Sequence, residues 1–201
     1  DNNIQNIGFN DGVLDESAFN TFVGTGKGYL DTWYDQSGNG NHFFQAVTTR
    51  QPEVIFTNNK PDIIYKINNG TGCTLRSTKG SNALSNMGIL NSATVYTKFK
   101  TTATIPPYQY IYSSQHFTHE IEHNYIGHLR SYHGGTGAFV TEDTVNKFND
   151  GKYHTTETHI VASTSNRITV DSETSKSKTS FINFTQTSTD DNLTIGARID
   201  H

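Results

Sequence analysis

Cysteine is almost absent from this chain, since 201 residues contain only Cys73. A single cysteine excludes an internal disulfide and any metal site built from several cysteines, and we expect Cys73 to be a buried small residue. Charge is also scarce, at 17% of residues with a formal net charge of -4. A nucleic-acid surface needs clustered basic residues, so the sequence predicts no nucleic-acid partner. Scattered lysines are interpreted as solvated strand faces, including Lys98, Lys100, Lys176 and Lys178.

Long apolar runs are missing too, and this excludes membrane insertion by a hydrophobic helix. No segment has the pattern of a signal peptide. Only 32% of residues are hydrophobic, but 12 Phe and 10 Tyr can build a core, so the composition does not indicate disorder. Low charge and many Thr, Ser and Asn residues suit an extracellular or virion surface. The length suits one large domain, residues 1–201.

The periodicity that is present predicts an all-β fold with one short helix near the N-terminus. Asp15 is a suitable N-cap and Gly24 a suitable stop for a helix whose apolar face is Ala18, Phe19, Phe22 and Val23. The rest is short β-branched or aromatic segments separated by Gly, Asn, Asp and Ser. The predicted strands are 29–34, 53–56, 63–67, 94–99, 108–112, 138–141, 156–162, 167–170, 180–184 and 193–195. This spacing favours a β-sandwich or jelly roll, with Asp171 and Ser172 as turn residues.

One segment carries a family resemblance: Thr32-Trp33-Tyr34-Asp35-Gln36-Ser37-Gly38-Asn39-Gly40-Asn41-His42. Residues 32–45 resemble a signature segment of concanavalin A-like, laminin-G-like jelly-roll domains. They are particularly similar to the catalytic domain of α-L-arabinofuranosidase B and to related bacterial and phage modules. Gln51-Pro52 stands where those modules have a Gln-Pro pair. Residues 1–28 resemble their lead-in, and residues 193–198 their penultimate strand.

The resemblance implies a concanavalin A-like jelly-roll β-sandwich. It favours a non-catalytic carbohydrate-binding or structural decoration module of a larger extracellular or virion surface protein. The expected partners are glycans or other subunits of a surface assembly, and the module could be an oligomer. Family members continue past the segment that ends here at Arg198. We therefore expect residues 1–201 to be a single domain, taken from a longer chain and lacking the closing strand.

An alternative function is glycoside hydrolysis of the α-L-arabinofuranosidase type, which needs two carboxylates across one sugar. The resemblance implies a nucleophile after a Gly-rich stretch, where this chain has Glu142 and Asp143 close by. At the place of the family's acid stands Arg198, and Asp200 comes two residues later. Arg198 at the place of the acid, and carboxylates that lie only close to the place of the nucleophile, both favour the non-catalytic interpretation.

A second alternative comes from His119-Glu120-Ile121-Glu122-His123, which matches a zinc-hydrolase motif. That chemistry needs a helix, because both histidines must project from one helical face while Glu120 activates the zinc-bound water. The flanking residues indicate a strand, on which Glu120 would face away from both histidines. The match is therefore interpreted as chance, with adventitious zinc binding by His119 and His123 as the remaining possibility.

Two further groups could bind ligands. Asp35, Asn39 and Asn41 offer oxygen atoms that suit calcium, although the same residues suit a turn pinned by its own side chains. No cofactor is predicted apart from this possible calcium. Sugars are bound by stacking on aromatic rings and by planar polar groups. We therefore expect the carbohydrate site at a cluster beside a Gly-rich loop, namely Tyr125, His128, Arg130, Tyr132 and His133.

Overall fold

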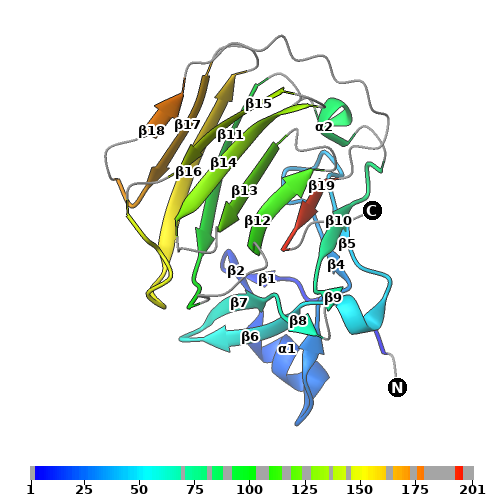
Figure 1. Cartoon of the computed structure of the whole chain (residues 1–201). Helices are drawn as coiled ribbons and strands as arrows, with labels where there is room; N and C mark the ends of the chain where they lie inside the picture. Colours follow the sequence, from blue (N-terminus) through cyan, green and yellow to red (C-terminus); the bar gives the residue numbers. More distant parts are fainter. Residues whose placement is uncertain are drawn as a thin grey trace. The chain divides into compact units, whose positions relative to one another are not determined.

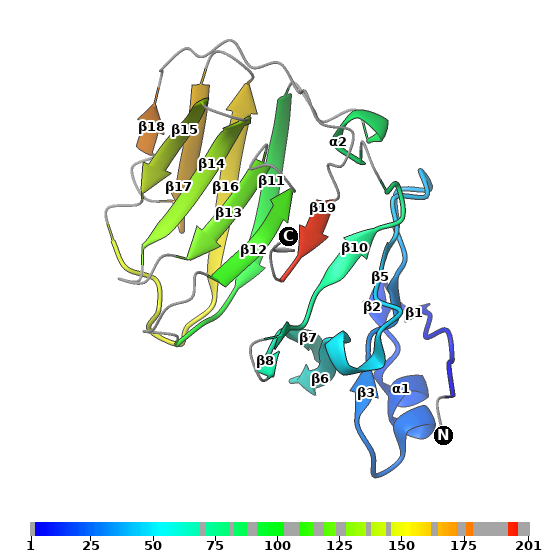
Figure 2. The ribbon, with the colours of Figure 1, turned by 45° about the vertical axis from the view of Figure 1, so that its right-hand side comes forward.

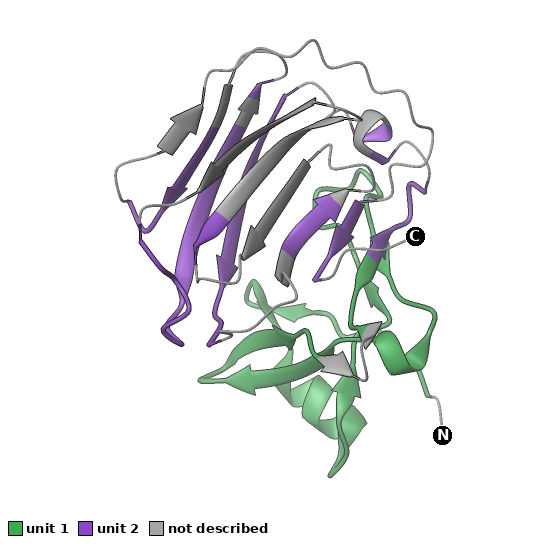
Figure 3. Ribbon diagram, viewed as in Figure 1, with its two compact units in different colours: residues 1–75 green, residues 76–201 purple. Residues whose placement is uncertain are grey.

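Antiparallel strands dominate the computed structural model, which describes residues 3–68, 71–80, 83–87, 92–102, 109–114, 119–123, 128–135, 138–143, 146–161, 165–172, 176–178 and 193–196. The chain divides into two compact units, Asp1–Leu75 and Arg76–His201 (Figure 3). That the whole chain is a single domain stays a prediction. In the described part of the chain, no helix combines the length and apolar character that crossing a membrane requires.

The first unit contains a short helix and several very short strands. Its elements are β1 (Phe9–Asn10), β2 (Val13–Leu14), α1 (Glu16–Val23), β3 (Gly28–Tyr29), β4 (Thr32–Trp33), β5 (Phe43–Phe44), the 3-10 helix η1 (Thr48–Arg50), β6 (Glu53–Thr57), β7 (Lys60–Ile64), β8 (Ile67–Asn68) and β9 (Thr71–Gly72). Strands β3, β6 and β7 form an antiparallel sheet, and β4 pairs with β5. Strand β10 (Leu75–Ser77) begins where this unit ends.

Helix α1 forms as the sequence predicts. The Asp15 carboxylate accepts a hydrogen bond from the Ala18 backbone N–H at 2.9 Å, which satisfies one of the open donors of the first turn. Gly24 ends the helix at a φ of 57°, and its N–H donates to the Asn20 carbonyl. On the packed face, the Phe19 ring lies 5.2 Å from the ring of Phe56 in β6. The predicted cap and stop are therefore confirmed, and Phe19 of the predicted apolar face is packed, whereas Phe22 of that face is 36% exposed.

The second unit is built from two antiparallel sheets (Figures 1 and 2). Within this unit, one sheet has the order β15-β14-β13-β12-β19-β10, and the other has the order β11-β16-β17-β18. Strand β17 contacts β14 and β15 of the opposite sheet, so the two sheets form a sandwich. The bounds are α2 (Ala83–Asn86), β11 (Ser92–Phe99), β12 (Gln109–Ser114), β13 (His119–His123), β14 (Leu129–Gly135), β15 (Ala138–Asp143), β16 (His154–Val161), β17 (Ser165–Val170), β18 (Lys176–Lys178) and β19 (Leu193–Ile195).

The core of this sandwich follows the period of two along its strands. Ile168 and Val170 are both 1% exposed on β17, and Leu129 is fully buried at the start of β14. Opposite Val170 and Ile168 on β16 lie Thr156 and Thr158, which are also buried. Alternate residues of β11 are exposed. One face of the sheet β11-β16-β17 therefore points into the core, and its other face is open to solvent.

Candidate binding face on the outer sheet

The open face of β11 carries the most exposed aromatic side chain of the second unit's described residues. Tyr96 is 72% exposed, and its backbone partner on β16 is Glu157. Large aromatic side chains usually bury most of their surface, because burial of apolar area is the main favourable contribution to folding. An aromatic ring left in solvent on a regular strand is therefore a candidate contact for a ligand.

Around Tyr96, hydrogen bonds across the strands hold planar polar groups in place. The Thr94 hydroxyl lies 2.9 Å from His159 Nδ1, between β11 and β16. Arg167 Nη2 on β17 donates to Glu157 Oε1 at 2.8 Å. Aromatic rings flanked by planar hydrogen-bonding groups are the combination that binds sugars, because the ring stacks on apolar C–H groups while the polar groups meet hydroxyls.

A second aromatic ring, Tyr153, lies beside the same strand with two lysines over it. The Lys98 Nζ atom is 4.7 Å from the centre of the Tyr153 ring, and the Lys100 Nζ atom is 4.6 Å from it. Lys98 pairs in register with Thr155, so Tyr153, two residues earlier, belongs to the same face. Tyr153 is 43% exposed. We call Lys98, Lys100 and Tyr153 the Tyr153 site. Both lysines are exposed, as expected for a solvated strand face, and their ammonium groups meet at one ring.

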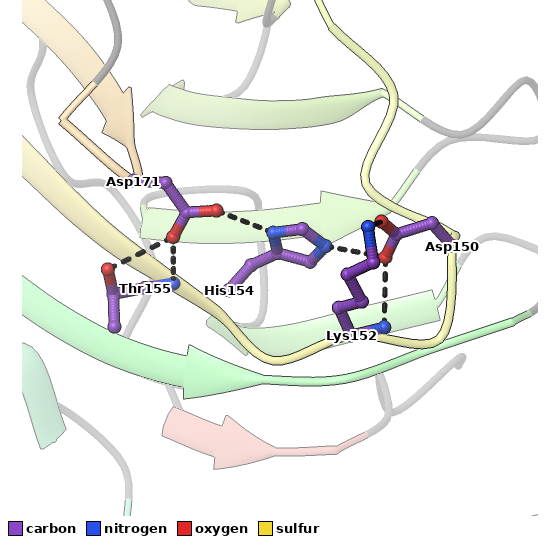
Figure 4. Close-up of polar contacts among 5 residues, drawn as sticks. All are labelled: Asp150, Lys152, His154, Thr155 and Asp171. Carbon is purple, nitrogen blue, oxygen red and sulfur yellow. Dashed lines mark hydrogen bonds and ion pairs between the residues drawn. The ribbon is translucent and has the colours of Figure 1, made fainter.

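Beneath this face, His154 is clamped between two carboxylates (Figure 4). Its Nδ1 lies 2.6 Å from Asp171 Oδ2, and its Nε2 lies 2.9 Å from Asp150 Oδ1. A carboxylate only accepts hydrogen bonds, so both contacts are satisfied together only when both ring nitrogens carry hydrogen. Asp171 Oδ1 also accepts from the Thr155 N–H at 2.8 Å and its hydroxyl at 3.2 Å. The imidazolium therefore ties the loop before β16 to the turn after β17.

The electrostatics of this clamp favour the charged forms. Burial lowers the pKa of His154, but hydrogen bonds and charges from Asp171 and Asp150 outweigh it and raise the pKa above its ordinary value. Hydrogen bonds from the Lys152 backbone N–H, which has the larger effect, and from the His154 side chain lower the pKa of Asp150 to about 2. Burial acts to raise the pKa of Asp171, but hydrogen bonds from Thr155 and His154 hold it below its usual value.

Packing and backbone geometry complete the clamp. The His154 ring is 5.0 Å from the Phe148 ring, edge to face, and 5.7 Å from the Phe99 ring. Between Asp150 and His154 the chain turns at Gly151, whose φ is 78° and whose N–H donates to the Thr101 carbonyl at 3.0 Å. The loop is thus held at both ends. It positions Tyr153 on the open face while the next residue, His154, is buried.

The carbohydrate site expected from the sequence lies only partly within the described residues. Tyr125 lies outside them, and His128 is half-buried just before β14. The other three residues are on β14, where they pair in register with Glu122, Glu120 and His119: Arg130, Tyr132 and His133. This site stays a prediction.

The suggested catalytic carboxylates, Glu142 and Asp143, are successive residues of β15. In register, Glu142 pairs with Ser131 and Asp143 with Arg130. Two carboxylates that act on one glycosidic bond must lie on its two sides at a set separation. The resemblance places only the nucleophile in this segment, so a catalytic role for either Glu142 or Asp143 stays a prediction.

The zinc motif residues His119 and His123 are the first and last residues of strand β13. The strand expected from the flanking residues is therefore present, and the helix that zinc-hydrolase chemistry requires is not formed at this segment. Among the described residues, no group of three or more His, Cys, Asp or Glu side chains is placed to hold a metal ion.

The proposed calcium ligands belong to a loop that is pinned by its own side chains. Asp35 Oδ1 accepts from the Ser37 N–H at 2.8 Å, and Oδ2 accepts from the Ser37 hydroxyl at 2.8 Å and the Asn41 N–H at 3.0 Å. These bonds, led by the one from Asn41, lower the pKa of Asp35 to about 2. The amide of Asn39 donates to Ser37 Oγ. The Asp35 carboxylate thus serves as the loop's internal acceptor, in the manner of an Asx turn.

Comparisons with known proteins support the fold. No protein-family model and no curated protein matches the sequence. Among solved structures, the chain is similar to the binding domain of Paraclostridial mosquitocidal protein 1, at 9% identity over 81% of this chain and 41% of that one, with a TM-score of 0.60. A GH54 α-L-arabinofuranosidase soaked with a cyclic sulfate inhibitor matches at 14% identity over 91% of this chain and 46% of that one, with a TM-score of 0.56.

A third similar structure is the binding domain of botulinum neurotoxin DC in complex with rat synaptotagmin II, at 9% identity over 94% of this chain and 42% of that one, with a TM-score of 0.52. The chain therefore spans less than half the length of each of these proteins. Its fold is an all-β, concanavalin A-like jelly-roll β-sandwich, as the resemblance of residues 32–45 implied. Identity this low defines the fold alone, and function has to be argued from side chains.

Proposed function

We propose that this chain is a non-catalytic carbohydrate-binding module of a larger extracellular or virion surface protein. The observation that carries the proposal is the open face of β11 and β16, where Tyr96 is 72% exposed and Tyr153 is 43% exposed. Rings held on a strand, as Tyr96 is, or in a hydrogen-bonded loop, as Tyr153 is, can stack on sugar rings with little loss of conformational entropy. Two of the similar structures are binding domains of larger toxins, a role that fits a module on this fold.

The sites expected on β14 remain part of the proposal, since Tyr132 and His133 lie on the sheet opposite the one that carries Tyr96. The two sites can be tested by separate variants, because they lie on different sheets. A purely architectural role, in which the module joins other subunits of a surface assembly, requires neither site. Glycan binding therefore decides between recognition and decoration.

The test is a glycan array probed with the full-length protein that carries this chain. Three variants are probed on the same array. Two are double variants, Tyr96→Ala/Tyr153→Ala and Tyr132→Ala/His133→Ala, and the third is the single control Tyr29→Ala. Tyr29 is 53% exposed in the first unit, so the control removes a comparable ring elsewhere. We expect selective binding that is lost in Tyr96→Ala/Tyr153→Ala and kept in Tyr29→Ala. Absence of binding by the unmodified protein would overturn the proposal in favour of an architectural module.

A glycosidase of the arabinofuranosidase type is the second candidate, favoured by the similarity to the GH54 enzyme. Its test is release of p-nitrophenol from p-nitrophenyl α-L-arabinofuranoside. We expect no release above that of buffer. Activity that disappears in Glu142→Gln or Asp143→Asn would establish the enzyme and displace the binding module.

A further inference from the structure

We propose that the Tyr153 site binds acidic polysaccharides, through their sulfate or carboxylate groups, and this inference rests on the proposed carbohydrate-binding function. The site consists of Lys98 and Lys100, whose ammonium groups lie 4.7 and 4.6 Å from the centre of the Tyr153 ring. It thus combines two positive charges with an exposed aromatic face. A charged sugar presents the complementary pair, an anionic group and an apolar face of C–H groups.

Within the part of the chain that the structure describes, no neighbour neutralises the positive charge of this site. Among the described residues, no carboxylate lies within ion-pair distance of Lys98 or Lys100. Three other charged side chains described on or near this face are paired with opposite charges: Lys152 with Asp150, His154 with Asp171, and Arg167 with Glu157. On a chain of net charge -4, the Tyr153 site is therefore a local excess of positive charge.

The ring also prepares both lysines for binding. A free lysine side chain loses about 1.5–2 kcal/mol of rotamer entropy when it is fixed. Contact with the ring already restricts Lys98 and Lys100, and each ammonium group has three N–H donors, so donors remain for an anion. The ring itself is positioned by the loop Asp150–His154. Much of the side-chain entropy that binding would remove is thus already lost in the unbound protein, and this favours affinity.

The probes are three polymers with one backbone: dextran, dextran sulfate and carboxymethyl dextran of matched length. Binding is measured by biolayer interferometry on the full-length protein at low and high sodium chloride. We expect binding to the two anionic polymers to exceed binding to dextran at least about tenfold, and to weaken with salt, because exposed charges are screened. The sulfate and carboxymethyl arms distinguish which anionic group is preferred.

Variants locate the effect. Lys98→Gln and Lys100→Gln should each weaken binding to the preferred anionic polymer about two- to fivefold, as expected for one exposed charge contact. Tyr153→Ala should weaken it about threefold to tenfold, whereas Tyr153→Phe should retain it. The control Lys60→Gln removes one exposed lysine at the start of β7 and should leave binding unchanged.

Four outcomes overturn the inference. If Lys60→Gln and Lys98→Gln weakened binding to the anionic polymer equally, the binding would be a general attraction between lysines and a polyanion. Equally strong binding of a single-stranded DNA of matched charge would show that no sugar is recognised. Binding of neutral glycans on the array, with no preference for anionic dextran, would leave the proposed function standing and refute this inference alone. Absence of all glycan binding would refute both.

Discussion

The substitution Asp171→Asn tests the His154 clamp, and its effect should depend on pH. Asp171 has a φ of 47°, a left-handed conformation that asparagine tolerates as well as aspartate does. The substitution therefore keeps the backbone and the shape of the side chain. It removes one charge and the hydrogen bond from the protonated Nδ1 of His154. The carbonyl oxygen of the introduced amide can still accept from the Thr155 N–H.

The expected magnitude follows from the groups involved. A hydrogen bond between charged groups contributes about 1.5–3 kcal/mol, and exposed ion pairs contribute about 0–1 kcal/mol. The His154 side chain is 10% exposed and the Asp171 side chain is 39% exposed, so the pair lies between a buried charged hydrogen bond and an exposed ion pair. We expect Asp171→Asn to lower the free energy of unfolding by about 1–2 kcal/mol at pH 5.5.

At pH 8.5 the difference should shrink or reverse. The pKa of His154 is raised on folding, so its contribution is fully present below the unfolded-state pKa and is lost as pH rises through the folded-state pKa. A neutral imidazole donates only one hydrogen, and in the unmodified protein one carboxylate then faces a lone pair. In the variant, the amide N–H₂ can donate to Nδ1 while Nε2–H donates to Asp150. The variant therefore loses less stability between pH 5.5 and 8.5.

The assay is urea unfolding followed by far-UV circular dichroism at the two pH values. Tryptophan fluorescence is unsuitable, because the single tryptophan, Trp33, lies in the first unit and His154 in the second. Asp11→Asn is the matched control, since Asp11 is exposed, has a φ of 50° and lies in the turn between β1 and β2. Equal destabilisation by Asp171→Asn at both pH values would show that His154 does not change its protonation state between pH 5.5 and 8.5, and would refute the predicted pH dependence.

Three other substitutions test particular contacts. Thr158→Val should raise the free energy of unfolding by about 1 kcal/mol in urea, because the fully buried Thr158 hydroxyl has no hydrogen-bond partner among the described residues; destabilisation would contradict this. Gly28→Ala should cost about 1–3 kcal/mol by the same assay, since a Cβ there overlaps the Phe19 ring, and a neutral result would show that the ring moves aside cheaply. Asp35→Ala, which releases the Asn41 N–H, should make the loop more sensitive to limited proteolysis; unchanged cleavage would contradict its role as the internal acceptor.

Much of the fold could be predicted because it depends on local patterns. The cap at Asp15, the stop at Gly24 and the strands within 53–56, 94–99 and 193–195 follow from short-range propensities. Segment 29–34 was predicted as one strand but forms two, β3 and β4, separated by Leu30 and Asp31. Strand β7 begins earlier than predicted and includes Pro61, because β-propensity depends on tertiary pairing more than on the residue.

The candidate binding face was missed because it depends on pairing between distant segments. Alternation along residues 94–99 places Tyr96 and Lys98 on one face, and this signal was available in the sequence. Tyr153, however, joins them only through the pairing of β11 with β16, more than fifty residues later in the chain. The same holds for His154, whose partner Asp150 is four residues away but whose partner Asp171 lies after the next strand. Single-sequence patterns do not specify such registers.

Because Tyr153 and His154 are neighbours in sequence, the buried clamp and the exposed site should be coupled. The loop from Asp150 to His154 positions the ring, and protonated His154 holds that loop through two hydrogen bonds. Deprotonation of His154 removes one of these hydrogen bonds and loosens the loop. Binding of anionic dextran should therefore weaken between pH 5.5 and 8.5 in the unmodified protein. In Asp171→Asn, the introduced amide can donate a hydrogen bond to Nδ1 of the neutral imidazole. Binding of anionic dextran by this variant should therefore change less over the same pH range. A pH dependence identical in both proteins would show that the ring is positioned independently of His154.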